Sequence, residues 1–222
     1  MRAILIATLV IGLGGCDGRP YFDLTELIYM EITPSFSTGC ENDAAGFEVC
    51  RAVRVQQVEN GVNEWFKHFD LATQPQVVIV YSKEELPPNL VNKVINIKVK
   101  SGGCFSDGKY HQGCFRYAYG KTPEIVFDNS TGIMPFLVAH EFGHALGRDH
   151  DDTAKDVYSI MSYTLQSYVV PVDIDLLCEM HSECPPHENV WCEGGFYDPC
   201  RCPSASFEEG AAMLATGEIT CE

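Results

Sequence analysis

Residues 140–150 of the chain read HEFGHALGRDH. The surrounding apolar positions predict a helix, and residues four apart in a helix lie on the same face. His140 and His144 can therefore bind one ion together. Gly147 can adopt the left-handed conformation that ends a helix and turns the chain, and His150 follows three residues later. The stretch predicts three imidazole ligands around one metal ion.

The expected metal is one catalytic Zn²⁺. Zinc binds neutral histidine nitrogens, and its catalytic sites combine three protein ligands with an open position for water, whose pKa falls to about 7. Glu141 follows His140 directly and lies about 100° around the helix from it. Its carboxylate can therefore act as a general base while it stays outside the coordination shell.

The spacing H-E-x-x-H-x-x-G-x-x-H resembles the extended zinc motif of the metzincin metalloproteases. A chance match to its five fixed positions would occur in roughly one chain in 10⁴. The alternative interpretation is a polar helix with surface histidines. Residues 159–163, SIMSY, also resemble the metzincin Met-turn, which implies that Met161 lies beneath the metal. Tyr163 matches a tyrosine that approaches the metal in the astacin and serralysin branches, but it could equally be an ordinary tyrosine.

The branch within this clan stays open. His150 followed by Asp151 resembles adamalysins, residues 159–163 resemble serralysins, and the compact size with a short final helix is closer to matrixins. These three resemblances disagree, so the sequence supports the clan and leaves the branch undecided.

Apolar runs and periodicities predict the remaining elements. The expected strands are Leu27–Thr33, Gln76–Ser82, Ile95–Val99, Phe115–Tyr119 and Glu124–Asp128, and the expected helices are Val55–Phe69, Ile133–Leu146 and Val172–His181. This order predicts an α+β fold, with a mixed sheet and a long helix packed on it. The metzincin resemblance implies a twisted sheet with two long helices, a zinc cleft and a small lower subdomain. It also implies that the substrate lies antiparallel to the edge strand Phe115–Tyr119.

The amino terminus has the pattern of an export signal. Arg2 precedes an apolar run from Ala3 to Leu13, which is shorter than the about 20 residues that span a bilayer. Leu13–Cys16 resembles the lipobox of bacterial lipoproteins, in which the cysteine becomes the lipidated amino terminus. We therefore expect residues 1–15 to be a signal peptide and Cys16 to anchor the protein on the periplasmic or cell-surface side. The alternative is an ordinary cleaved signal and a secreted protein.

Eleven cysteines predict a disulfide-bonded protein, and a lipidated Cys16 would leave an even ten. The close pairs Cys40–Cys50 and Cys104–Cys114 are expected to be local bridges. The remaining six are expected to pair among themselves, without a preferred pairing: Cys178, Cys184, Cys192, Cys200, Cys202 and Cys221. We thus predict a catalytic domain over residues 16–181 and a disulfide-rich tail over residues 182–222.

The composition and net charge limit the classes of molecule that the protein is expected to bind. The 222 residues are 45% hydrophobic and carry a formal charge of −16, which indicates a folded soluble domain and disfavours nucleic acid and anionic lipid. We expect a monomer that acts on a protein or peptide, with membrane contact only through the lipid. An acidic cluster could hold Ca²⁺, although solvated loop charge is the preferred interpretation: Asp149, Asp151, Asp152 and Asp156. The other histidines singled out have no metal-like spacing: His68, His111, His181 and His187.

The sequence therefore favours a zinc metalloendopeptidase that hydrolyses peptide bonds of extracytoplasmic proteins. Two alternatives remain: an inactive zinc-containing binding or adhesion module, and a protein whose cysteine-rich tail docks a partner. Glu141 favours the enzyme, because a module that only binds zinc has no chemical need for a carboxylate beside the ligands.

Overall fold

The structure is a computed structural model. It describes residues 22, 24–70, 72–87, 90, 94–106, 108–118, 121–150, 159–162, 169, 171–181 and 183–185. Several predictions lie outside the described residues: the signal peptide, lipidation of Cys16, the position of Tyr163, and nearly all of the tail.

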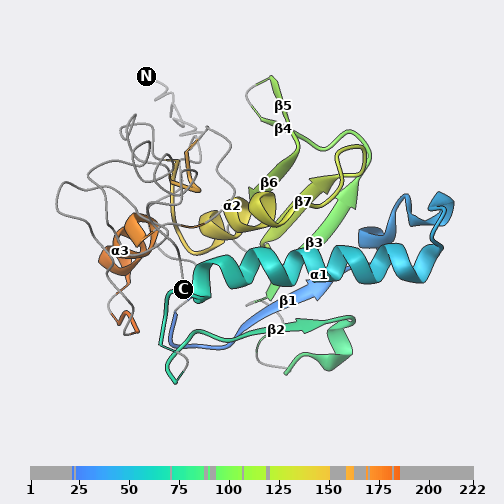
Figure 1. Ribbon diagram of the computed structural model, residues 1–222. Helices are drawn as coiled ribbons and strands as arrows, with labels where there is room; N and C mark the ends of the chain where they lie inside the picture. Colours follow the sequence, from blue (N-terminus) through green and yellow to red (C-terminus); the bar gives the residue numbers. More distant parts are fainter. Residues whose placement is uncertain are drawn as a thin grey trace, which may run out of the picture.

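A five-stranded mixed sheet forms the centre of the fold, with strand order β2-β1-β3-β7-β6 (Figure 1). Neighbouring strands are parallel except for β6, which is antiparallel to β7 and forms one edge. The strands are β1 (Ile28–Ile32), β2 (Val77–Val80), β3 (Val94–Lys100), β6 (Gly113–Arg116) and β7 (Glu124–Asp128). The sheet confirms the predicted α+β class and its mixed strand directions.

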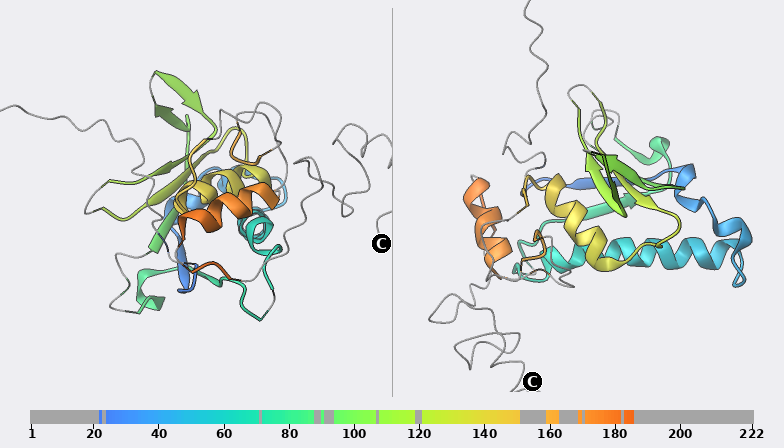
Figure 2. Two further views of the ribbon diagram at one scale, coloured as in Figure 1. Left: turned by 90° about the vertical axis from the view of Figure 1, so that its left-hand side faces the viewer. Right: turned by 90° about the horizontal axis from the view of Figure 1, so that it is seen from above.

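The described residues form three α-helices beside the sheet: α1 (Phe47–Phe66), α2 (Pro135–Ala145) and α3 (Pro171–Met180). Helices α1 and α2 lie on the same side of the sheet (Figure 2), and their apolar faces join those of the strands in one buried core. At Gly61 the two helices approach so closely that a Cβ atom would lie 2.5 Å from the Pro135 carbonyl oxygen. Trp65 adds a hydrogen bond from its indole N–H to the Ala139 carbonyl at 2.7 Å. These contacts fix the helix that carries the histidine motif.

Some boundaries differ from the sequence prediction. Helix α1 begins at Phe47, eight residues before the predicted Val55, because its first two turns expose apolar residues such as Val49 and Val53 and so show no buried stripe. The edge strand runs from Gly113 to Arg116, so the prediction Phe115–Tyr119 was wrong at both ends.

A short hairpin was missed entirely. Its strands, β4 (Cys104–Ser106) and β5 (Lys109–His111), pair with each other and project beyond the main sheet (Figure 1). Strands of three residues are too short to show a clear alternation of apolar and polar positions.

Three disulfides lie among the described residues: Cys40–Cys50, Cys104–Cys114 and Cys178–Cys184. The first two are the predicted local bridges, and the third lies within the group expected to pair among itself. Such bridges point to an oxidising, extracellular environment. In the described part of the chain, no helix combines the length and the apolar character needed to cross a membrane.

Candidate metal centre

The three histidines of the motif converge at the end of α2. His140 and His144 share one face of the helix, and Gly147, with φ of +95°, turns the chain so that His150 returns to them. The Nε2 atom of His150 lies 3.1 Å from that of His140 and 3.2 Å from that of His144. The convergence of the three histidines that the spacing predicted is therefore observed.

Backbone carbonyls orient two of the rings. The Nδ1–H of His140 donates to the Ile160 carbonyl at 2.7 Å, and the Nδ1–H of His144 donates to the Arg148 carbonyl at 2.7 Å. A carbonyl can only accept, so each proton must be on Nδ1 and each Nε2 must present a lone pair. Burial is the main cause that lowers the pKa of both histidines, to about 3 for His144, which favours neutral rings.

The separations fit a bound cation. In a tetrahedral zinc site with Zn–N bonds of about 2.05 Å, neighbouring nitrogens are about 3.3 Å apart. The observed Nε2 separations of 3.1 and 3.2 Å are close to this value. Lone pairs that face each other at such distances repel unless a cation lies between them. The three histidines could therefore hold a metal ion, and this imidazole set is compatible with zinc.

Met161 packs directly beneath the motif helix. Its side chain is fully buried, and a Cβ atom at Gly143 would lie 2.4 Å from its sulfur and 2.6 Å from the Trp65 ring. The glycine inside the motif is therefore the position at which the methionine and the tryptophan reach the helix backbone, one residue before His144.

The turn that contains Met161 is anchored by Asp173 in the first turn of α3, a role that sequence reasoning missed. The Ser159 hydroxyl and the Ile160 N–H both donate to the Asp173 carboxylate, the latter at 3.1 Å. The Met161 N–H in turn donates to the Ser159 hydroxyl oxygen at 2.9 Å. Because the Ile160 carbonyl accepts from His140, Asp173 indirectly fixes a metal-facing ring. A carboxylate among the apolar residues of the predicted final helix was the available signal.

Glu141 lies between α2 and the edge strand β6. Its side chain is only 4% exposed, and a Cβ atom at Gly113 would lie 3.1 Å from its Oε1 atom. Burial raises the pKa of Glu141 to about 8, against the opposing effect of a hydrogen bond from the Phe115 backbone N–H. Gly113 and Phe115 therefore define the position of the predicted base, and neither was identified from sequence.

The remaining predicted groups give little further chemistry. Asp149 is exposed, and the other three members of the acidic cluster lie outside the described residues. His68 donates to the Val169 carbonyl at 3.1 Å and His181 to the Leu146 carbonyl at 3.2 Å. Both bonds agree with the interpretation of these histidines as ordinary structural residues.

Comparison with known proteins adds no assignment: no protein-family model matches the sequence, and no curated protein matches it significantly. The inferences below therefore depend on the residues and their geometry, together with the resemblance of the motif.

Proposed function

We propose that this protein is a zinc-dependent endopeptidase of the metzincin type, which hydrolyses peptide bonds in extracytoplasmic proteins. The observation that carries the proposal is a buried glutamate beside three converging imidazole nitrogens. His140, His144 and His150 would hold the metal, and Glu141 would be the general base.

When bound, Zn²⁺ supplies a Lewis acid that activates water near neutral pH and polarises a substrate carbonyl. Glu141 would accept the proton of the attacking water and pass it to the leaving amine. In the metal-free site its pKa of about 8 disfavours the charged form. A divalent cation among the three rings would lower that pKa, because a nearby positive charge favours the carboxylate. Metal binding and ionisation of the base would thus support each other.

The edge strand would hold this base in place. One carboxylate oxygen of Glu141 lies over Gly113, and the carboxylate accepts from the Phe115 N–H. A carboxylate fixed in this way keeps its second oxygen for the water, and orientation of a catalytic group lowers the barrier of the step that uses it.

The same strand offers a place for an extended substrate. The Asp128 N–H donates to the Gln112 carbonyl, so the alternation of an antiparallel ladder directs the N–H and C=O of Gly113 and the C=O of Phe115 away from β7, as it does the Phe115 N–H that donates to Glu141. A peptide can add to such an edge as a further strand. This location, beside Glu141, agrees with the edge-strand binding implied by the metzincin resemblance.

We also propose that the protein is exported, with residues 1–15 as the signal peptide and a lipid on Cys16. The three disulfides support an oxidising compartment. Intact-mass analysis of the exported protein tests the proposal, because an unmodified Cys16 or cleavage at another site contradicts it.

The enzyme is tested by comparing Glu141→Ala with the wild type and with His150→Ala. Glu141→Ala should keep one zinc per chain and lose about 10² to 10⁴ in turnover of a quenched peptide. His150→Ala should lose both metal and activity, because it removes one of the three proposed ligands. Metal content and turnover are measured on the same preparations. A wild-type protein that binds zinc but cleaves no peptide or protein would instead be the inactive binding module.

A further inference from the structure

The charge of the chain is unevenly distributed around the edge strand. Residues 94–123 contain five basic residues and one acidic residue, a net charge of +4, although the whole chain carries −16. The remainder therefore carries −20. Residues 94–123 extend from β3 through the hairpin and β6 to the turn before β7. This basic stretch of a very acidic protein includes the edge strand beside Glu141.

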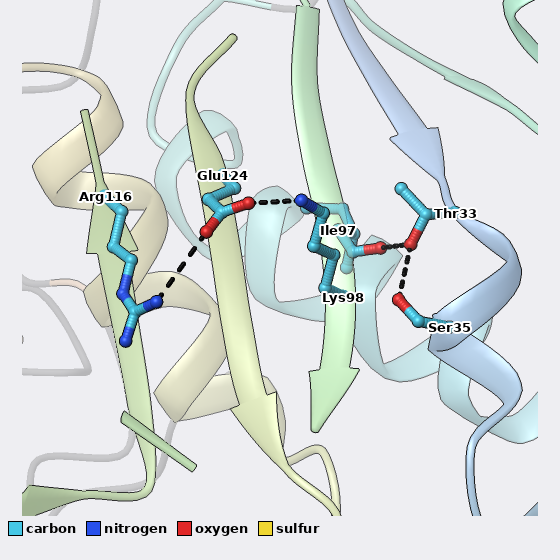
Figure 3. Close-up of polar contacts among 6 residues, drawn as sticks. All are labelled: Thr33, Ser35, Ile97, Lys98, Arg116 and Glu124. Atoms are coloured by element: carbon cyan, nitrogen blue, oxygen red, sulfur yellow. Dashed lines mark hydrogen bonds and ion pairs between the residues drawn. The ribbon is translucent and has the colours of Figure 1, made fainter. Parts of the chain in front are cut away.

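Arg116, at the end of β6, is the cation of this stretch that lies on the edge strand itself. Its side chain is 41% exposed, and its partner is Glu124, at 3.8 Å, which is beyond hydrogen-bond distance. Glu124 also accepts from the Lys98 ammonium, so one carboxylate faces two cations (Figure 3). Among the described residues, no acceptor lies within hydrogen-bond distance of the Arg116 guanidinium. This planar fork can bind another carboxylate through two parallel hydrogen bonds.

Other features continue the same surface on both sides of β6. Lys109 lies before the strand and Lys121 after it, and both are exposed. On the hairpin, Phe105 is 70% exposed and its ring packs edge-on against Tyr110, with centroids 6.0 Å apart. The hairpin is held by the Cys104–Cys114 disulfide and by a hydrogen bond from the Tyr110 hydroxyl to Asp128. An exposed aromatic pair on an anchored hairpin gives an apolar contact area next to the basic edge.

We propose that this edge selects acidic peptide segments, and that Arg116 binds an aspartate or glutamate side chain of a substrate paired with β6. The inference rests on the proposed peptidase function and names its substrate class. Lys109 and Lys121 add attraction along the bound strand, and the Phe105–Tyr110 pair contacts apolar side chains beyond its end. Because these charges are solvent-exposed, the preference weakens as salt is added.

The test uses quenched peptides in which one glutamate is moved along an otherwise neutral sequence. At the best position this glutamate is then replaced by glutamine or lysine. For the wild type, kcat/KM should fall from glutamate to glutamine to lysine, by about 10-fold overall, mainly through KM. Arg116→Gln should remove the difference, and Arg116→Glu should reverse it in favour of lysine. Lys83→Glu is the matched control, since it makes the same change of charge at an exposed lysine following β2, at the opposite edge of the sheet.

Binding separates this inference from the proposed function. Zinc-loaded Glu141→Ala, with and without Arg116→Gln, is titrated with the same labelled peptides by fluorescence anisotropy. Tighter binding of the glutamate peptide that depends on Arg116 supports the inference even if the wild type cleaves nothing, which would overturn only the peptidase. Cleavage or binding without an acidic preference overturns the inference, as does a Lys83→Glu effect equal to that of Arg116→Glu.

Discussion

Two glutamates are buried in the described part of the chain, one on each face of the sheet. Glu141, 4% exposed, accepts a hydrogen bond from the edge strand beside three histidines. Glu31, 5% exposed, is on β1, whose alternate residues Met30 and Ile32 pack under the helices, so it faces the other side. Its Oε2 atom has no hydrogen-bond partner. Burial alone therefore does not identify a functional carboxylate. The groups around it, such as the three histidines beside Glu141, are the better indication.

The strand register explains why Glu31 is poorly paired. A row across the sheet aligns one residue from each strand: Val80, Glu31, Asn96, Glu124 and Arg116. Towards the β6 edge, Glu124 meets Arg116 and Lys98. Towards β1, Glu31 and Asn96 each keep a buried oxygen without a partner. Unpaired buried polar atoms cost stability, so the part of this row at Glu31 and Asn96 is destabilising.

The sharpest test exchanges each buried glutamate for glutamine. Glu141→Gln should lower turnover by about 10² to 10⁴ with zinc retained, because an amide cannot act as the base. Glu31→Gln should leave turnover unchanged and raise the free energy of unfolding by about 1 kcal/mol, because an amide is less costly to bury than a carboxylate with one oxygen unpaired. Peptide turnover and urea denaturation are measured for both. Equal losses of turnover would abolish the distinction between the two faces.

The anchoring of the Met161 turn can be tested next. Asp173→Asn should weaken zinc binding by about 10- to 100-fold, because it loosens the carbonyl that orients His140. Asp175→Asn, two residues further along the same helix and partly exposed, is the control and should retain the affinity. Competition with a zinc chelator gives both values. Equal effects would show that α3 acts only through general stability.

The packing of Met161 and Trp65 against the motif helix can be tested through the free energy of unfolding. Gly143→Ala places a methyl group against Met161 and Trp65 and should lower the free energy of unfolding by about 1 to 3 kcal/mol. Adding Met161→Ala to that variant should cost less than Met161→Ala costs alone, since the new methyl group occupies part of the space. Strict additivity in urea denaturation would contradict the contact.

The smallest expected effect concerns Asp128, a well-paired carboxylate on β7. Hydrogen bonds from Ser130 and then Tyr110 are the main causes that lower its pKa from 3.8 to about 2. Its contribution to stability is therefore complete above pH 4 and is lost as the pH falls towards 2. Asp128→Asn should flatten the loss of stability between pH 4 and pH 2, as followed by thermal unfolding. An unchanged profile would place the acid sensitivity at other groups.

The features that could be predicted from the sequence are those whose residues lie close together in the chain. Residues 140–150 predicted the three converging histidines because a helix and one glycine turn determine their relation. The positions of Asp173, Gly113 and Phe115 depend on how α3 and β6 pack against α2, and no local pattern encodes that packing. The β4–β5 hairpin was missed for a different reason, since its strands are too short for periodicity.

The closeness of the three ligands in the chain also affects the order of assembly. His140 and His150 are ten positions apart, so only a short loop must close to bring them together, at little cost in chain entropy. A partly folded chain could already capture the ion, and such capture reduces the stabilisation that the metal gives to the native state. The contact of Glu141 with Phe115 joins residues 26 positions apart and requires the sheet and α2 to be packed. We expect metal capture to precede alignment of the base, so that the nascent protein holds zinc before it can cleave anything.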